Sequence, residues 1–293
     1  MDYIVIAAMT SSVYALLALG YALVYSSLRL INFAHGEFCM IGAYVALGVL
    51  QIPGCSAWVA LVAAVVGGGT AAAVTWLVAY RPLQKADRSS AIIAAIGASI
   101  CLQQIVSRSV GAQSRAFSLS LWDGSIAVGG VDVDSTSVLC ATSMLVVLGL
   151  VHILWQHTHV GLAVRAVADD RDAAESVGIS SQRIVLWTFL LAGTVAGIAG
   201  IALAASLSRV DPTMGFAPGL KAFVAALAGG LHDPRKAALG GLFLGIAETL
   251  AVVAGLSAYR DALVLLALVG ILLAQARLQD RSPLLRTSLI EED

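Results

Sequence analysis

The polar residues that could take part in chemistry begin in a short break between two apolar runs near the N-terminus. The break reads Leu30-Ile31-Asn32-Phe33-Ala34-His35-Gly36-Glu37-Phe38. Ionisable groups at membrane depth are costly and generally face a cavity or a partner. One interpretation is structural, with Asn32 capping a helix whose positive end favours Glu37. The alternative is a pathway lined directly by Asn32, His35, Gly36 and Glu37, whereas catalysis is disfavoured because no nucleophile or third polar group lies nearby in the sequence.

A second break runs from Arg209 to Gly219 and reads Arg-Val-Asp-Pro-Thr-Met-Gly-Phe-Ala-Pro-Gly. Backbone broken in this way is tolerated at membrane depth only against protein or a water-filled cavity, so the sequence predicts a discontinuous helix. Lys221 follows in an apolar stretch; it either extends its ammonium group to the membrane interface or, with Phe216, faces a pathway. Glu248 is expected to be a hydrogen-bonded residue of the helix bundle rather than a substrate ligand.

A third charged segment, Gly161–Ile179, combines helix-forming residues with alternating charge. Arg165 and Asp169 are four residues apart and therefore share a helical face, and Gly178 is a suitable helix stop. A short helix pair lying parallel to the membrane would suit docking to a soluble partner. An ordinary charged loop explains the same pattern, and the residues alone leave both interpretations open.

The elements that position these residues are predicted to be membrane-spanning helices. Apolar residues make up 59% of the 293 positions and charged residues 12%, with a mean hydropathy of +0.90; a soluble domain is about 45–50% apolar and about 25% charged. Several uncharged runs reach the roughly 20 residues that cross a bilayer core. The first run follows Asp2 without a basic n-region, so we expect it to be retained as a span.

The fold class predicted is an all-α polytopic membrane protein with about eight to nine transmembrane segments. Seven segments are predicted to span, and the short segments at 37–51 and 220–231 leave open whether they cross fully. The nine are Tyr3–Tyr25, Glu37–Gln51, Ser56–Tyr80, Ser89–Ser107, Val138–Trp155, Val185–Leu207, Leu220–Leu231, Ala237–Leu256 and Asp261–Ala276.

The two halves of this single transmembrane domain, 1–293, show the same order of segments. A long span, a polar break, a short glycine-containing span and two further spans occur in residues 3–107 and again in residues 185–276. An odd number of spans separates the copies, which predicts inverted repeats whose short, interrupted segments border a translocation path. We therefore expect the segments Asn32–Glu37 and Phe216–Lys221 to lie close together near the middle of the membrane.

The distribution of Lys and Arg predicts the orientation, because cytoplasmic loops retain positive charge. The cytoplasmic face then includes the loop 157–184 and the C-terminus, while the N-terminus and the segment 108–137 are external. That face holds 12 of the 17 basic residues, namely Arg29, Arg81, Lys85, Arg88, Arg165, Arg171, Arg183, Arg235, Lys236, Arg277, Arg281 and Arg286.

Other functional classes lack the residues they need. A net charge of -1 without a basic stripe gives no indication of nucleic-acid binding. The cysteines Cys39, Cys55, Cys101 and Cys140 have no CxxC spacing, which argues against a metal site or a disulfide framework. No Gly-x-x-x-x-Gly-Lys-Ser/Thr motif occurs, so the chain is not expected to bind ATP and Mg²⁺ itself, and no cofactor is expected in it.

Three separated motifs resemble one transporter family, in the same order and over nearly the whole chain. They are Ile31–Phe38 with Met40-Ile41-Gly42-Ala43-Tyr44, the Gly161–Ile179 segment, and Leu220-Lys221-Ala222-Phe223 leading to Gly229-Gly230. These closely resemble the LivH-type permeases of branched-chain amino-acid ABC importers. Many relatives read Gly-Gly-Leu-Gly followed by Pro where this chain has Gly229 to Pro234, with His232 and Asp233 in the turn, which leaves the local geometry open.

The resemblance implies a function and a set of partners. The expected function is import of branched-chain or related amino acids across the bacterial inner membrane, driven by ATP hydrolysis in separate subunits. The implied partners are two ATPase subunits, a second permease of LivM type, a periplasmic amino-acid-binding protein and the lipid bilayer. The segment beginning at Arg165 resembles a coupling element that seats in the ATPase, which implies a docking surface formed by Arg165, Ala166, Asp169, Ala173, Ala174 and Gly178.

Two rival functions remain to be weighed. An ion- or proton-coupled secondary transporter of a small polar solute would also have inverted repeats and broken helices. It would need an ion site, for which His35, Glu37 and Glu248 are the candidates, and no ATPase-docking segment. A membrane enzyme would need a convergent polar constellation, which the sequence does not suggest.

Overall fold

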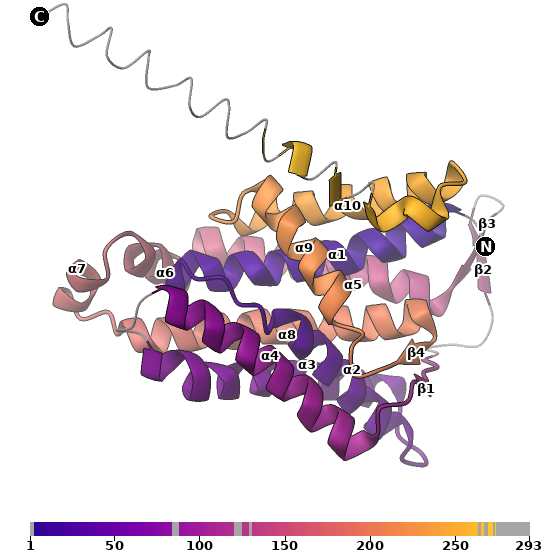
Figure 1. The fold of residues 1–293 in the computed structure, drawn as a ribbon, viewed down its shortest axis with the longest axis horizontal. Helices are drawn as coiled ribbons and strands as arrows, with labels where there is room; N and C mark the ends of the chain where they lie inside the picture. The colour runs from indigo at the N-terminus through magenta and orange to yellow at the C-terminus, as the bar shows by residue number, and fades with distance from the viewer. Residues whose placement is uncertain are drawn as a thin grey trace, which may run out of the picture.

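The computed structural model describes residues 3–83, 88–119, 125–128 and 131–262, with a few further positions up to 273. Long apolar helices lie side by side along this part of the chain (Figure 1), as expected for an all-α polytopic membrane protein. Six are long and apolar enough to cross a membrane by length and composition. They contain α1 (Tyr3–Leu28), α3 (Ala57–Thr75, extended by a π-helical turn at Trp76–Tyr80 and a 3₁₀ turn at Arg81–Leu83), α4 (Arg88–Val110), α5 (Ser135–His157), α8 (Ser181–Leu207) and α10 (Pro234–Val253).

Shorter helices and strands connect the long helices along the chain. Two apolar helices, α2 (His35–Leu50) and α9 (Phe216–Gly229), follow the two polar breaks, and α6 (His159–Asp169) and α7 (Arg171–Ser176) form a pair between α5 and α8. The strands β1 (Arg115–Ala116) and β4 (Arg209–Val210) pair antiparallel, as do β2 (Ser125–Val128) and β3 (Val131–Asp134). A 3₁₀ turn follows α10 at Ser257–Tyr259, and the predicted span Asp261–Ala276 lies only partly within the described residues.

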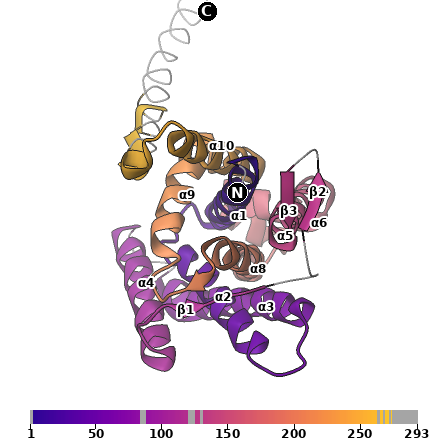
Figure 2. The same cartoon turned by 90° about the vertical axis from the view of Figure 1, so that its right-hand side faces the viewer.

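Helices α1 and α8 form the centre of the bundle. About two thirds of the apolar window of α1 (67%) and of α8 (61%) is buried, whereas α4 (17%) and α5 (28%) are mostly uncovered. Viewed along the bundle, α10, α9, α2, α3 and α5 surround this central pair, and α4 lies at the edge (Figure 2). The uncovered faces of α4 and α5 are the ones left for lipid or for another subunit.

Glycines let the central helices approach closely. A Cβ built on Gly197 of α8 would lie 2.2 Å from the Ala64 carbonyl oxygen of α3, and one on Gly200 would lie 2.1 Å from the Cys39 carbonyl oxygen of α2. On α10, a Cβ at Gly241 would lie 2.3 Å from the Tyr14 carbonyl oxygen of α1. Since lipid supplies no hydrophobic drive for helix association, close backbone packing is what holds such a bundle together.

The polar residues His232 and Asp233 have structural roles in the turn between α9 and α10. Gly230 has a φ of +112°. Asp233 then caps α10 by accepting a hydrogen bond from the Arg235 backbone N–H at 3.0 Å, with Pro234 in the first helical turn. His232 packs edge-on against Tyr25, with ring centroids 5.3 Å apart. The polar residues therefore build a capped helix start here.

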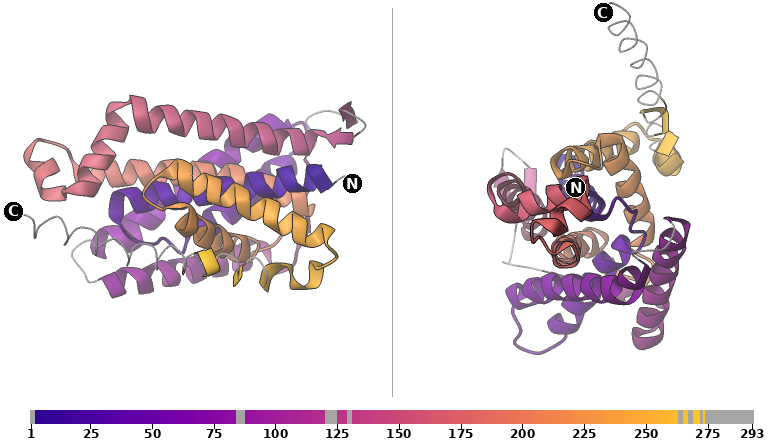
Figure 3. Two further views of the ribbon diagram at one scale, coloured as in Figure 1. Left: turned by 90° about the horizontal axis from the view of Figure 1, so that it is seen from above. Right: turned by 90° about the vertical axis from the view of Figure 1, so that its left-hand side faces the viewer.

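The two ends of the bundle carry different elements. The pair α6 and α7 lies at one end, and the N-terminus and the β1–β4 pair lie at the other (Figure 1; Figure 3, left). The connections at these ends are shorter than predicted: α4 continues to Val110 and α5 begins at Ser135, so the connecting segment is 111–134 rather than 108–137. The α6–α7 pair and the N-terminus, which are predicted to lie on opposite sides of the membrane, are at opposite ends of the bundle (Figure 1).

Candidate functional site

The two polar breaks meet inside the bundle, as the sequence predicts. A Cβ on Gly36 would lie 2.4 Å from the Gly215 carbonyl oxygen, and one on Gly215 would lie 2.0 Å from the Gly36 carbonyl oxygen. Glycine is required at both positions because the backbones touch there. The N-terminal ends of α2 and α9 are thereby fixed against each other.

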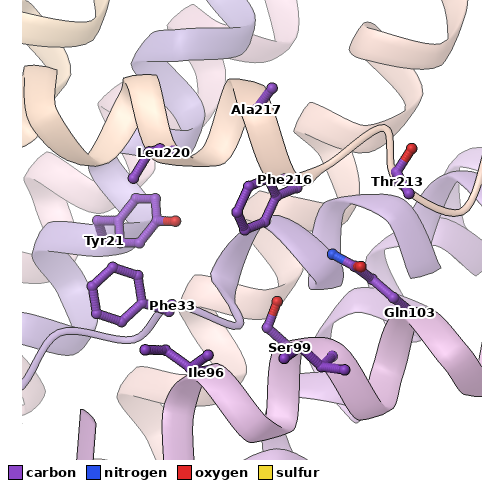
Figure 4. Close-up of a pocket in the computed structure, with 11 residues that line it drawn as sticks. Tyr21, Phe33, Ile96, Ser99, Gln103, Thr213, Phe216, Ala217 and Leu220 are labelled. Carbon is purple, nitrogen blue, oxygen red and sulfur yellow. The ribbon is translucent and has the colours of Figure 1, made fainter. Parts of the chain in front are cut away.

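A cavity of about 630 Å³ opens beside this crossing. Its walls come from α1, the first break, α4 and the start of α9, and most of the side chains that line it are apolar (Figure 4). Small-molecule sites in proteins have volumes of roughly 300–1,000 Å³ and combine apolar walls with a few placed polar groups. The lining residues are Tyr21, Phe33, Gly36, Ile96, Ser99, Ile100, Gln103, Thr213, Phe216, Ala217 and Leu220.

Glu37 lies directly behind the polar part of this lining. Its side chain is fully buried, and its Oε1 accepts hydrogen bonds from Ser99 Oγ at 3.0 Å and from Gln103 Nε2 at 2.7 Å. Ser99 and Gln103 are one helical turn apart on α4 and both line the cavity. A buried carboxylate is thus separated from the cavity by two neutral side chains that donate to it.

A second hollow, of about 390 Å³, adjoins the first on the side of the β1–β4 pair. Gln103 and Thr213 line both hollows, so they form the boundary between them. The second hollow is polar: its lining includes Arg209 and Asp211, and the Thr213 hydroxyl donates to Asp211 Oδ1 at 2.8 Å.

An ion network built around two buried charges, Lys221 and Glu248, ties α9 to α10. Lys221 is 8% exposed, and its Nζ lies 3.0 Å from Glu248 Oε1 and 2.7 Å from Asp261 Oδ1. Arg260 Nε also lies 3.0 Å from Glu248 Oε1. Charges buried in this way must be paired to be tolerated, and here two cations face two carboxylates.

The α6–α7 pair is a defined structure rather than an irregular loop. Asp170 caps α7 by accepting from the backbone N–H groups of Asp172 and Ala173, each at 3.0 Å. Gly178 has a φ of +87°, which allows the chain to turn after α7. The Ser181 hydroxyl donates to the Glu175 carboxylate and, with the neighbouring Arg171 guanidinium, lowers the pKa of that carboxyl group.

Comparison with known proteins places this architecture in a family. Residues 3–272 match the family described as "Branched-chain amino acid transport system / permease component". The chain belongs to this permease family. It is 37% identical over 276 residues to the LivH permease protein of Escherichia coli K12, covering 89% of each chain, and 35% identical over 251 residues to the BraD permease protein of Pseudomonas aeruginosa, covering 81% of each.

A solved structure shows the same fold at greater distance. The chain resembles PsaBC from Streptococcus pneumoniae in complex with Fab, with a TM-score of 0.51, 14% identity, and coverage of 94% of this chain and 91% of that one. The identity is low, so this likeness concerns the fold alone. Together with six apolar spans, family membership identifies the chain as a multi-pass permease subunit of the inner membrane.

The predicted pathway residues of this permease fall into two groups. Gly36 and Phe216 line the cavity. Four others lie outside its lining: Asn32, His35, Glu37 and Lys221.

Asn32 and His35 have packing roles in the permease. Asn32 Oδ1 accepts from the Ala34 backbone N–H at 3.1 Å and from Tyr80 Oη at 2.9 Å, so the interpretation of Asn32 as the cap of α2 is wrong: Ala34 occupies that position. The His35 ring is fully buried, with its centroid 4.6 Å from that of Tyr21.

The structure agrees with neither of the two interpretations of Lys221. Its ammonium group neither extends alone to an interface nor lines the cavity, because it is paired with Glu248 and Asp261. Glu248 forms ion pairs with Lys221 and Arg260 inside the bundle, in agreement with the bonded role that the sequence predicts.

Among the predicted docking residues of the permease, exposure differs. Asp169, Ala173 and Gly178 are exposed, Arg165 and Ala166 are half-buried, and Ala174 is buried. The Arg165 guanidinium donates to the Trp155 carbonyl oxygen at the end of α5. Asp169, four residues from Arg165, instead forms an ion pair with Arg29 at 3.8 Å.

Sequence reasoning missed Ser99, Gln103 and Thr213. Ser99 and Gln103 are four apart in an uncharged run, which places two polar groups on one face of a helix. That spacing was the available signal. Thr213 lies in the second break, but its place at the boundary between the two hollows depends on how α4 packs beside that break.

Proposed function

We propose that this chain is the membrane-spanning subunit of an ATP-driven importer for branched-chain or related amino acids. Membership of the permease family over residues 3–272 carries this proposal. Relatives named as branched-chain amino acid permeases in bacteria and in Methanocaldococcus jannaschii support the substrate class. The cavity agrees with such a solute, since its walls suit an aliphatic side chain and its polar rim suits a charged head group.

The importer requires partners that supply energy and capture the solute. We propose two ATPase subunits that bind ATP and Mg²⁺, a second permease of LivM type and a periplasmic amino-acid-binding protein. The chain has no P-loop motif of its own. The α6–α7 pair is proposed as the ATPase-docking element, because it is an ordered, partly apolar projection at one end of the bundle.

We further propose that the halves 3–107 and 185–276 are inverted repeats. In both halves a long helix ends at a residue of left-handed conformation, Arg29 (φ 55°) after α1 and Ser208 (φ 54°) after α8, and a break and a short helix follow. These are the two non-glycine residues with positive φ in the described chain. Such a conformation is uncommon outside glycine, so its recurrence at matching positions supports the repeat.

Reconstitution tests the function directly. The permease, purified with its neighbours from the native membrane, is expected to retain two ATPases and a second permease and, with the binding protein, to accumulate leucine in proteoliposomes only when ATP is supplied. Uptake that follows an imposed proton or sodium gradient without ATP would instead establish the secondary-transporter alternative. Radiolabelled leucine uptake, with and without ATP, separates the two.

The orientation is tested by cysteine labelling. In a variant lacking the native cysteines, Ala112→Cys beyond α4 is expected to react with an impermeant maleimide from outside the cell. Ser176→Cys on α7 is expected to react only in inverted vesicles, because basic loops stay in the cytoplasm. Both positions are exposed, so a reversed pattern would reject the orientation with an external N-terminus and a cytoplasmic C-terminus.

A further inference from the structure

The junction between the two hollows has an unusual polarity. Gln103 and Thr213, which line both hollows, each donate a hydrogen bond to a carboxyl group: Gln103 to Glu37, which is buried behind it, at 2.7 Å, and Thr213 to Asp211, which itself lines the second hollow, at 2.8 Å. A glutamine or threonine side chain that donates a hydrogen bond in this way still has an oxygen that can accept a hydrogen bond. The junction therefore presents neutral side chains, each held by a carboxyl group and each with an oxygen that can accept, beside the Asp211 carboxylate in the second hollow.

The two hollows on either side of this junction differ in character. On one side lies the apolar chamber, walled by Phe33, Ile96, Ile100, Phe216 and Leu220. On the other side lies the polar vestibule, with Arg209 in its lining. In Figure 4, Gln103 and Thr213 lie at one end of the chamber and Tyr21 and Phe33 at the other.

These features match the three parts of an aliphatic α-amino acid. Its ammonium group needs hydrogen-bond acceptors near negative charge, its carboxylate needs a cation, and its side chain needs an apolar space. The junction, Arg209 and the chamber supply these in that order. A simple aliphatic carboxylate, which has no donor hydrogen, would leave the acceptors of the junction unused.

We propose that Gln103 and Thr213 bind the ammonium group of an α-amino acid while its aliphatic side chain lies in the chamber and its carboxylate faces Arg209. This site deepens the proposed importer function and rests on it. Glu37 acts as a positioning residue, because it orients Gln103 from behind the lining. Asp211 orients Thr213 and, since it lines the vestibule, also places negative charge beside the ammonium group. The site is distinct from the packing roles of Asn32 and His35.

Direct binding to the purified permease complex in lipid nanodiscs tests the site. Saturation-transfer NMR with L-leucine, in the absence of the binding protein, reports contact between the amino acid and the permease. Gln103→Leu and Thr213→Val are each expected to weaken leucine binding roughly tenfold or more, because a hydrogen bond to a charged group is lost. Gln51→Leu is the matched control, since Gln51 is an exposed glutamine at the end of α2 that lines neither hollow.

One analogue of leucine identifies the group that is recognised. 4-Methylpentanoate keeps the aliphatic chain and carboxylate of leucine but lacks the ammonium group, so it is expected to bind the unaltered complex at least tenfold more weakly than leucine. In Gln103→Leu that difference should shrink. Glu37→Gln should lower leucine affinity while leaving the lining side chains in place, as expected for a positioning residue.

The outcomes keep this inference separate from the proposed function. If the unaltered complex shows ATP-driven leucine uptake but Gln103→Leu and Gln51→Leu bind leucine equally well, the importer function stands and the site is wrong. If leucine and 4-methylpentanoate bind with equal affinity, the junction does not recognise the ammonium group. Co-purification of the ATPases with each variant shows that the complex is intact.

Discussion

Placing an arginine at Ala173, on the exposed face of α7, is expected to reduce ATPase association and leucine uptake at least about tenfold. If α7 seats in a groove of the ATPase, the new charge is buried there without a partner. An unpaired charge in an interface costs roughly 2–5 kcal/mol, and about 1.4 kcal/mol corresponds to a tenfold change in binding. ATPase co-purification and ATP-dependent uptake, measured on the same preparations, check this.

Ala173 is a better probe than the other predicted docking residues. Arginine is a good helix former, and the cap of α7 uses the Asp170 side chain and backbone groups, so the helix should persist. Arg165 also holds α6 against the Trp155 carbonyl group, so its substitution would change the fold of the pair as well as its surface. Ala174 is buried and cannot contact a partner directly.

The apolar surface of the helix pair supports docking. Leu162 is 58% exposed and Val177 is 75% exposed, beside charged neighbours at one end of the bundle. Large apolar side chains that are exposed beside charged residues are available for contact with a partner. The matched control is Ala254→Arg, an exposed alanine at the end of α10, which should leave uptake unchanged. Unchanged ATPase association and uptake in Ala173→Arg would mean that α6 and α7 are only a connector, and equal loss in both variants would contradict a specific role for α7.

The spans and breaks could be predicted from the sequence because they depend on local composition. Apolar runs of membrane length place α1, α3, α4 and α8, and the prolines and glycines of the second break interrupt the chain where the structure does. Helix ends were less accurate: α1 continues past Tyr25 to Leu28 and ends where Arg29 turns left-handed. That backbone choice is set by packing rather than by residue type.

The partners of buried charges could not be predicted in the same way. Ser99 and Gln103 lie 62 and 66 positions from Glu37, and Glu248 lies 27 positions from Lys221. Which helices meet depends on the glycine contacts between them, which no single segment reveals. The rule that intramembrane charges pair would have suggested Lys221 with Glu248, but not the part played by Arg260 and Asp261.

Removing the ammonium group of Lys221 is expected to destabilise the permease strongly. Lys221→Met keeps most of the side-chain volume but leaves Glu248, which is almost fully buried, with Arg260 as its remaining cation. Breaking a buried pair by removing one partner costs about 3–5 kcal/mol. The partly exposed Arg260 should offset some of this, so we expect a loss of about 2–4 kcal/mol, measured as a lower midpoint of thermal unfolding in detergent micelles.

The double variant shows whether the pairing itself is responsible. In Lys221→Met with Glu248→Leu both buried charges are gone, and Arg260 and Asp261 remain 3.3 Å apart. Replacing both partners of a buried pair by apolar groups is often nearly neutral, so the double variant should be more stable than either single one. Additive losses would show that the two side chains act independently, and Arg108→Met at an exposed position should change stability by less than about 0.5 kcal/mol.

The same double variant separates stability from transport, because α9 carries Lys221 as well as the chamber residues Phe216 and Leu220. If the ion network only stabilises the fold, the double variant should take up leucine at close to the normal rate once it is folded. If the network also fixes the chamber wall against α10, uptake should stay low although stability is restored. We expect the second result, because the ion pairs of Lys221 bind α9 to Glu248 on α10 and to Asp261 beyond it, and apolar substitutes would leave the wall free to shift.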